Sequence, residues 1–126
     1  MRRIGVALAL VSLFAVAAAC GGSSGGGQPA GSTKISLSEF KFDPGTASPV
    51  TVTHGKVVFW LVNTGNTSHD LQIKDSSGNA VATSELVSPG DSTEFDVDNL
   101  PAGTYTIVCT QPGHEASGMK GTLTAT

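Results

Sequence analysis

The chain has 126 residues, of which 39% are hydrophobic and only 13% are charged. This length is enough for one domain with a packed core and leaves little room for a second. The formal net charge is -3 at neutral pH, whereas a protein that binds nucleic acid usually presents a basic face. We therefore expect no nucleic-acid partner.

The N-terminal segment has the layout of an export signal. Met1, Arg2 and Arg3 form a short positive region, and a largely apolar run over 4–19 ends in alanines directly before Cys20. The run is short for a membrane-spanning helix, which needs about 20 apolar residues, and it fits a cleaved secretory signal. With a cysteine after the small residues, it resembles a bacterial lipoprotein signal, which implies cleavage before Cys20 and lipid on that residue. An uncleaved anchor and a plain signal peptide remain as alternatives.

Three segments are expected along the chain: a signal peptide over 1–19, a lipidated Cys20 with its tether over 20–31, and a folded domain over 32–126. The tether reads GGSSGGGQPAG after Cys20, a composition typical of a flexible linker. We expect the domain to be exported and lipid-anchored at the outer face of the cell membrane, on the periplasmic or extracytoplasmic side.

The folded part is expected to be all-β. Short runs rich in β-branched and aromatic residues recur between glycine, proline, asparagine and aspartate, which is typical of strands separated by turns. The expected strands cover 34–42, 49–53, 56–63, 69–74, 80–87 (one or two strands), 92–97, 104–109 and 119–126. Seven to eight strands of this kind predict a β-sandwich, with a small barrel as the alternative.

The scarce metal-binding residue types gather near the C-terminus. Cys109, His114 and Met119 fall within one short segment, and His69 stands at the start of an earlier expected strand. A thiolate, two imidazoles and a weak thioether form the ligand set of a type 1 copper site. Zinc also accepts two histidines and a cysteine, but a closed zinc site needs a stronger fourth ligand than Met119. If Cys20 carries lipid, Cys109 has no disulfide partner.

The segment CTQPGHEASGMKG, which begins at Cys109 and follows Gly103-Thr-Tyr-Thr-Ile-Val, resembles the copper-binding end of the cupredoxins. Its Cys-x4-His-x4-Met spacing is closest to the rusticyanin and sulfocyanin type and near that of azurin and auracyanin. The resemblance covers about residues 32–126 and implies a Greek-key β-sandwich. It also implies one type 1 copper ion, with these ligands: His69, Cys109, His114 and Met119.

One residue departs from the pattern of the family. The first histidine ligand is commonly followed by asparagine, whereas this chain has Asp70. The backbone N–H that bonds the thiolate is retained, but the sequence does not predict whether the side-chain contact between the two ligand loops is kept. The additional negative charge near the metal leads to the hypothesis of a lower reduction potential.

A complete ligand set without an open metal position favours electron transfer over catalysis, so we expect a one-electron carrier and not an enzyme. The expected partners are redox proteins of the cytochrome or copper oxidase type, together with the membrane through the lipid anchor, and the chain is expected to be a monomer. A copper-binding lipoprotein for storage or delivery is the alternative, and an interaction module without copper is the third possibility.

Other polar and aromatic residues receive simpler interpretations. We expect His54 to be a surface residue and Trp60 to lie in the core. Tyr105 resembles a tyrosine-corner residue, and ordinary core packing explains it equally well. Most acidic side chains are expected on a solvated face: Glu39, Asp43, Glu85, Asp91, Glu94, Asp96 and Asp98.

Overall fold

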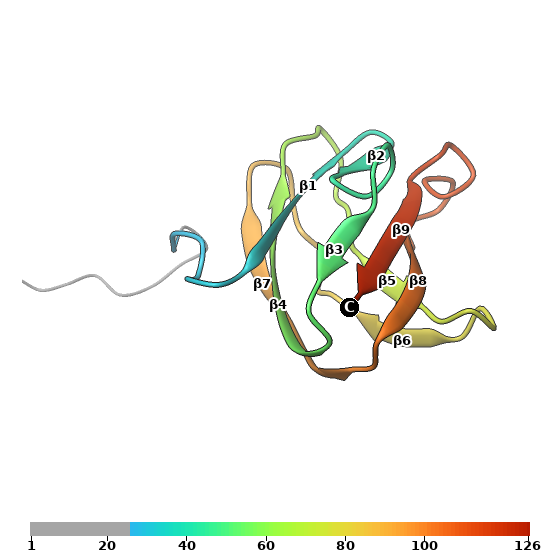
Figure 1. Ribbon diagram of the computed structural model, residues 1–126. Coiled ribbons are helices and arrows are strands. Elements are labelled where there is room, and N and C mark those ends of the chain that lie inside the picture. The colour runs from blue at the N-terminus through green and yellow to red at the C-terminus, as the bar shows by residue number, and fades with distance from the viewer. Residues whose placement is uncertain (1–25) are drawn as a thin grey trace, which may run out of the picture.

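Two β-sheets pack face to face in the computed structural model, which describes residues 26–126 (Figure 1). The first sheet has the order β2 (Lys41–Asp43), β1 (Thr33–Ser38), β4 (Gly55–Asn63) and β7 (Ser92–Leu100). The second has the order β3 (Val50–Val52), β9 (Lys120–Ala125), β8 (Gly103–Val108), β5 (Gln72–Lys74) and β6 (Ala80–Thr83). The expected all-β sandwich is confirmed, with nine strands in this part of the chain where seven to eight were expected.

The expected signal peptide over 1–19 and the lipid-bearing Cys20 lie outside the described residues, so both stay predictions. Within residues 26–126, no helix has the length and apolar character needed to cross a membrane.

Alternation of side chains along β4 builds the core between the sheets. Val57, Phe59 and Leu61 are buried, and the rings of Phe59 and Phe95 stack with centroids 5.8 Å apart. This period of two is what a strand with one covered face requires. The expectation that Trp60 lies in the core is wrong, because its side chain points to the outer face of the sheet and is partly exposed.

The first expected strand, 34–42, is divided in two by a turn. Ile35 and Leu37 on β1 and Phe42 on β2 are buried. Between the two strands, Glu39 and Phe40 form the turn, and 38% of Phe40 is exposed. The turn lies at the end of the sandwich where the β8–β9 connection also lies, the upper end in Figure 1.

Strand pairing brings the ligand-bearing segments together at that end. β8 and β9 are antiparallel neighbours that finish with Val108 opposite Lys120, and β5 lies antiparallel to β8 with Gln72 opposite Val108. Cys109 directly follows β8, and Met119 directly precedes β9. The connection between β4 and β5 carries His69, whose backbone forms an isolated bridge with Val87.

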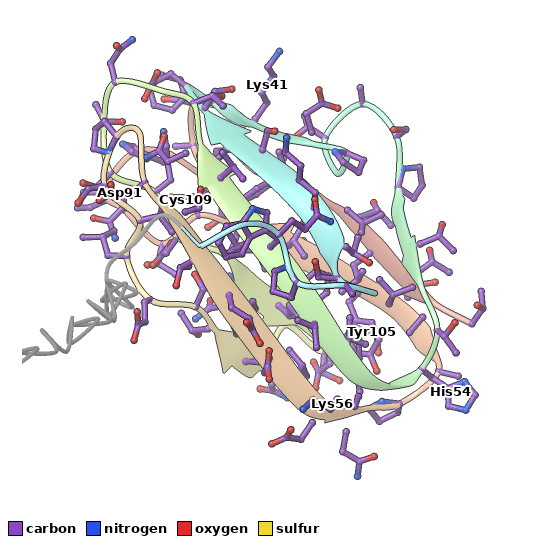
Figure 2. The ribbon with its side chains drawn as sticks, turned by 90° about the vertical axis from the view of Figure 1, so that its left-hand side faces the viewer. Lys41, His54, Lys56, Asp91, Tyr105 and Cys109 are labelled. Atoms are coloured by element: carbon purple, nitrogen blue, oxygen red, sulfur yellow. The ribbon has the colours of Figure 1, made fainter. Side chains whose placement is uncertain are left out.

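The other end of the sandwich contains two residues with simpler roles. The Tyr105 hydroxyl donates to the carbonyl oxygen of Pro101 at 2.7 Å, as expected of a tyrosine corner, and its ring is buried. His54 is exposed, with its Nδ1 2.8 Å from the carbonyl oxygen of Thr126. The exposure of His54 confirms its expected surface position. The labelled side chains of His54 and Tyr105 both lie far from Cys109 in Figure 2.

Candidate metal centre

Donor atoms from three of the four expected ligands converge in the structure. The Sγ of Cys109 lies 3.9 Å from Nδ1 of His69 and 3.5 Å from Nδ1 of His114. The two Nδ1 atoms are 3.1 Å apart. His69 and Cys109 are buried, whereas His114 is partly exposed. One small ion therefore fits between three donors that come from two separate connections.

The spacing of these atoms suits a single metal ion. Donors bound at about 2.0–2.3 Å in a trigonal plane lie roughly 3.5 Å from one another, and the three observed separations range from 3.1 to 3.9 Å. The chemistry of the set, one thiolate and two imidazoles, is that of the equatorial ligands of a type 1 copper site.

Met119, the fourth expected ligand, is fully buried at the base of the same loop. Its backbone N–H donates to the carbonyl oxygen of His114 at 3.0 Å, and its carbonyl oxygen accepts from the N–H of Cys109 at 3.2 Å. These backbone hydrogen bonds link the three expected ligands of the loop, Cys109, His114 and Met119. The structure thus places the thioether-bearing residue beside the two other ligands of its loop.

Short turns close the loop between Cys109 and Met119. The N–H of His114 donates to Gln111 at 3.1 Å, and the N–H of Gly118 donates to Glu115 at 2.9 Å. Gly113 and Gly118 have φ angles of 78° and 110°, which side chains other than glycine rarely adopt. Two glycines therefore permit the tight path that turns His114 back toward Cys109.

The Cys109 sulfur is buried and receives backbone hydrogen bonds. Burial raises the pKa of Cys109, and the negative charge of Asp70 acts in the same direction. The backbone N–H groups of Asp70 and Gln111 donate to the sulfur and partly offset this rise in the pKa. Such donors favour the thiolate, the form in which cysteine binds a metal.

Asp70 keeps the side-chain connection between the two ligand segments. Its carboxylate is buried and accepts a hydrogen bond from the backbone N–H of Thr110 at 2.6 Å and another from the Thr110 hydroxyl. Asp70 follows one ligand and Thr110 follows another, so the contact joins the chain beside His69 to the chain beside Cys109. Aspartate therefore supplies this contact in place of the asparagine common in the resembled family.

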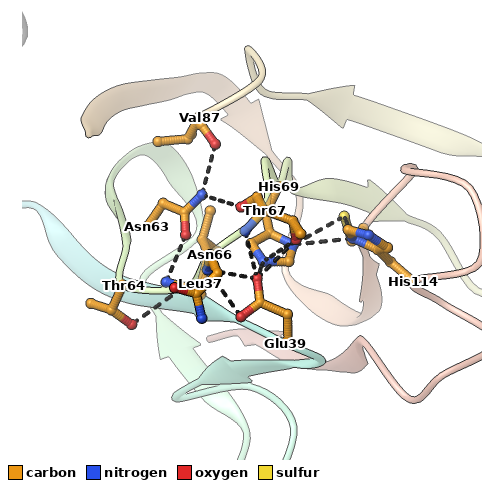
Figure 3. A network of polar contacts seen from close by, with 11 residues as sticks. Leu37, Glu39, Asn63, Thr64, Asn66, Thr67, His69, Val87 and His114 are labelled. Atoms are coloured by element: carbon orange, nitrogen blue, oxygen red, sulfur yellow. Dashed lines mark hydrogen bonds and ion pairs between the residues drawn. The ribbon is translucent and has the colours of Figure 1, made fainter. Parts of the chain in front are cut away.

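Glu39 is the residue of the site that the sequence did not reveal. It was expected on a solvated acidic face, but its Oε1 lies 2.9 Å from Nε2 of His69 (Figure 3). The backbone N–H of Asn66, and then the hydroxyl and N–H of Thr67, lower the pKa of Glu39 to about 2. No local motif marks this role, since the carboxylate and the imidazole are far apart in sequence.

The residue after Glu39 contacts the other imidazole. The ring of Phe40 meets the ring of His114 edge to face, with centroids 5.1 Å apart and an interplanar angle of 67°. Adjacent residues in the β1–β2 turn thus touch both histidines of the centre, Glu39 the buried one and Phe40 the partly exposed one.

Asn63, at the end of β4, shapes the connection that carries His69. Its buried side chain donates to the carbonyl oxygens of Thr67 at 2.7 Å and Val87 at 2.8 Å, and it accepts from the N–H of Gly65 at 2.9 Å (Figure 3). His69 and Val87 also exchange backbone hydrogen bonds. The backbone of His69 is therefore held by Val87, and its ring is held by Glu39.

Comparisons with known proteins identify relatives for most of the chain. Residues 6–125 match the family model of the cupredoxin-like domain. Auracyanin-B of Chloroflexus aurantiacus is 44% identical over 48 residues, which are 38% of this chain and 20% of that protein, so the match spans about a fifth of it. Plastocyanin of Scenedesmus fuscus is 39% identical over 89 residues, which cover 66% of this chain and 84% of the plastocyanin.

A similar fold occurs among solved structures. The crystal structure of dithionite-reduced auracyanin from Roseiflexus castenholzii superposes with a TM-score of 0.65 at 22% identity. The superposition covers 84% of this chain and 99% of that one. The two-sheet architecture described above is therefore shared over nearly the whole length of that protein.

Proposed function

This chain belongs to the cupredoxin family, and from this premise we propose that it is a one-electron carrier with a single type 1 copper ion. The proposed ligands are His69, Cys109, His114 and Met119. When bound, the copper supplies a single-electron couple between Cu(I) and Cu(II). The observation that carries the proposal is the convergence of a buried cysteine sulfur and two imidazole nitrogens within 4.8 Å of one another.

Contacts within the protein hold the proposed ligands in place. Backbone hydrogen bonds link Cys109 to Met119 and Met119 to His114, and Glu39 holds the ring of His69. Ligands fixed in this way keep their positions when the charge of a bound ion changes, which favours rapid electron exchange. A complete set of four ligands also leaves no open position for a substrate, which supports a carrier rather than an enzyme.

We place the route of electron exchange at His114. Its ring is the partly exposed member of the centre, and the residues around it in the loop, Pro112, Gly113 and Ala116, are exposed. These small, uncharged residues suit a transient contact with a redox protein, for which we propose a cytochrome or a copper oxidase. After removal of Arg2 and Arg3 the chain has five lysines against ten acidic residues, which favours a positively charged partner surface.

The proposed location is the outer face of the cell membrane, on the periplasmic or extracytoplasmic side. Support comes from the sequence of the first 20 residues and from the glycine-rich segment that follows them. We propose that a lipid on Cys20, joined to the domain by the glycine-rich segment, lets the domain turn toward a partner. We propose that the domain works as a monomer in this setting.

Copper loading tests the function directly. The purified chain is titrated with Cu(II), and the expected result is an intense visible band from thiolate-to-copper charge transfer that bleaches and returns through cycles of reductant and oxidant. Cys109→Ser is the matched control and is expected to remove the band entirely. Copper that leaves the protein on reduction would instead support storage or delivery, and absence of the band from the unaltered chain would overturn the proposal.

A further inference from the structure

The ring of His69 bridges Glu39 and the metal-binding atoms. Its Nδ1 faces Cys109 and His114, at 3.9 Å from the sulfur and 3.1 Å from Nδ1 of His114. Its Nε2 lies 2.9 Å from Oε1 of Glu39, and the residue is completely buried. When Nδ1 binds the metal, Nε2 carries the ring proton and donates it in a hydrogen bond to the carboxylate.

The carboxylate of Glu39 is itself firmly held. It accepts hydrogen bonds from the N–H of Asn66 at 2.9 Å, from the N–H of Thr67 at 2.9 Å and from the Thr67 hydroxyl at 2.8 Å. Gly65 lies directly beneath it, since a Cβ added there would be 2.5 Å from Oε1. The 65–67 segment therefore forms a cradle that fits a carboxylate only while residue 65 has no side chain.

Pairing between β1 and β4 places Glu39 in this cradle. The two strands run parallel with Leu37 opposite Asn63, and the N–H of Thr64 donates to the carbonyl oxygen of Leu37 at 2.9 Å. Continuing that register by two residues places Glu39 beside Gly65. The register of the first sheet thus sets the position of Glu39 next to His69.

We propose that Glu39 is a positioning residue that fixes the His69 ring for copper and lowers the reduction potential of the centre. The inference rests on the proposed copper function. A carboxylate that accepts from the far nitrogen of a ligating imidazole orients the ring and increases its basicity. A more basic ligand, with a negative charge behind it, stabilises Cu(II) more than Cu(I), and this preference corresponds to a lower potential.

Glu39→Gln is the first test, because it keeps the size of the side chain and one oxygen acceptor while it removes the negative charge. We expect the affinity for Cu(II) to fall about tenfold relative to that for Cu(I), which is a rise of about 59 mV in potential for a one-electron couple. The potential is measured by redox titration of the visible band, and the Cu(II) hyperfine splitting is measured by EPR.

Two further variants separate charge from position. Gly65→Ala retains the charge but forces the carboxylate out of its cradle, and we expect the potential to rise as in Glu39→Gln. Glu115→Gln is the matched control: it removes the same charge from an exposed residue next to His114, and solvent screening keeps its effect on the potential smaller. Urea unfolding of each metal-free variant shows whether the fold is retained.

The outcomes are distinguishable. Absence of the blue band from the unaltered chain overturns the copper function and the inference with it. A blue unaltered chain, with Glu39→Gln at the same potential and the same EPR spectrum, overturns the inference alone and leaves the carrier function standing. An equal rise in potential for Glu39→Gln and Glu115→Gln also overturns it, because the effect would then be one of net charge and not of the contact with His69.

Discussion

The carboxylate of Asp70 accepts hydrogen bonds from both the backbone N–H and the hydroxyl of Thr110. Continuing the β5–β8 register two residues beyond the pair of Gln72 and Val108 places Asp70 opposite Thr110. Strand pairing therefore extends, through a side chain, into the loops that carry His69 and Cys109. A contact in this position couples the stability of the fold to the geometry of the metal centre.

Removal of this contact is expected to destabilise the metal-free protein. Asp70→Ala should lower the free energy of unfolding by about 2–3 kcal/mol, because hydrogen bonds to a charged group are lost and their donors lie in a partly buried site. Urea denaturation measures the change. Asp96→Ala is the control, since Asp96 pairs with Lys56 at 3.5 Å on the exposed surface, where such a pair contributes about 0–1 kcal/mol. Equal losses for the two variants would contradict the role of Asp70.

Sequence patterns located most of the centre because its ligands are arranged locally. Cys109, His114 and Met119 lie in one loop, and the glycines and turns that fold the loop are visible in the sequence itself. His69 was expected at the beginning of a strand over 69–74, whereas the strand begins only at Gln72 and His69 lies in the connection before it. What the local pattern could not supply was the chemistry of the neighbouring Asp70, because its partner Thr110 is fixed by pairing between strands distant in sequence.

Glu39 and Trp60 show the same limit. The role of Glu39 depends on parallel pairing of β1 with β4, and no short motif encodes which strands become neighbours. Trp60 sits in a run of apolar residues, and alternation identifies two faces of the strand without showing which of them a second sheet covers. The sandwich was therefore predictable from local patterns, whereas its strand neighbours and uncovered face required the three-dimensional structure.

Asp70→Asn tests whether the acidic side chain tunes the metal. An amide can still accept from the N–H of Thr110 and bond its hydroxyl, so we expect the free energy of unfolding to stay within about 1 kcal/mol of the unaltered value. The negative charge of Asp70 stabilises Cu(II) more than Cu(I), so its removal should raise the reduction potential. Redox titration of the visible band checks the direction, and an unchanged or lower potential would contradict the hypothesis.

Tyr105 allows stability to be changed without changing the metal centre. Tyr105→Phe removes the hydroxyl that donates to Pro101 at 2.7 Å and should lower the free energy of unfolding by about 1 kcal/mol. Tyr105 and Cys109 lie at opposite ends of the sandwich (Figure 2), so the visible spectrum and potential should stay unchanged. A shift of the copper band in this variant would show that the two ends are coupled.

Phe40 is expected to limit access to the metal through His114. Phe40→Ala removes the ring that meets the imidazole at 5.1 Å and should speed the transfer of copper to a chelator, measured as the rate at which the visible band decays. The loss in stability should be about 1 kcal/mol, as expected for one aromatic pair. Val81→Ala is the control, because Val81 is similarly exposed (41%) on β6. Equal chelation rates for both variants would contradict a shielding role.

Met119 has two competing explanations, core filler and axial ligand, and one substitution separates them. Met119→Leu conserves volume at a fully buried site, so the free energy of unfolding should change by less than about 1.5 kcal/mol. The blue band should persist because the thiolate remains. Loss of the weak thioether donor should raise the potential, since the axial ligand helps to stabilise Cu(II). Leu123→Met, the reverse exchange at a buried position of β9, should leave the potential unchanged. If both variants keep the original potential, Met119 fills the core and does not act as a ligand.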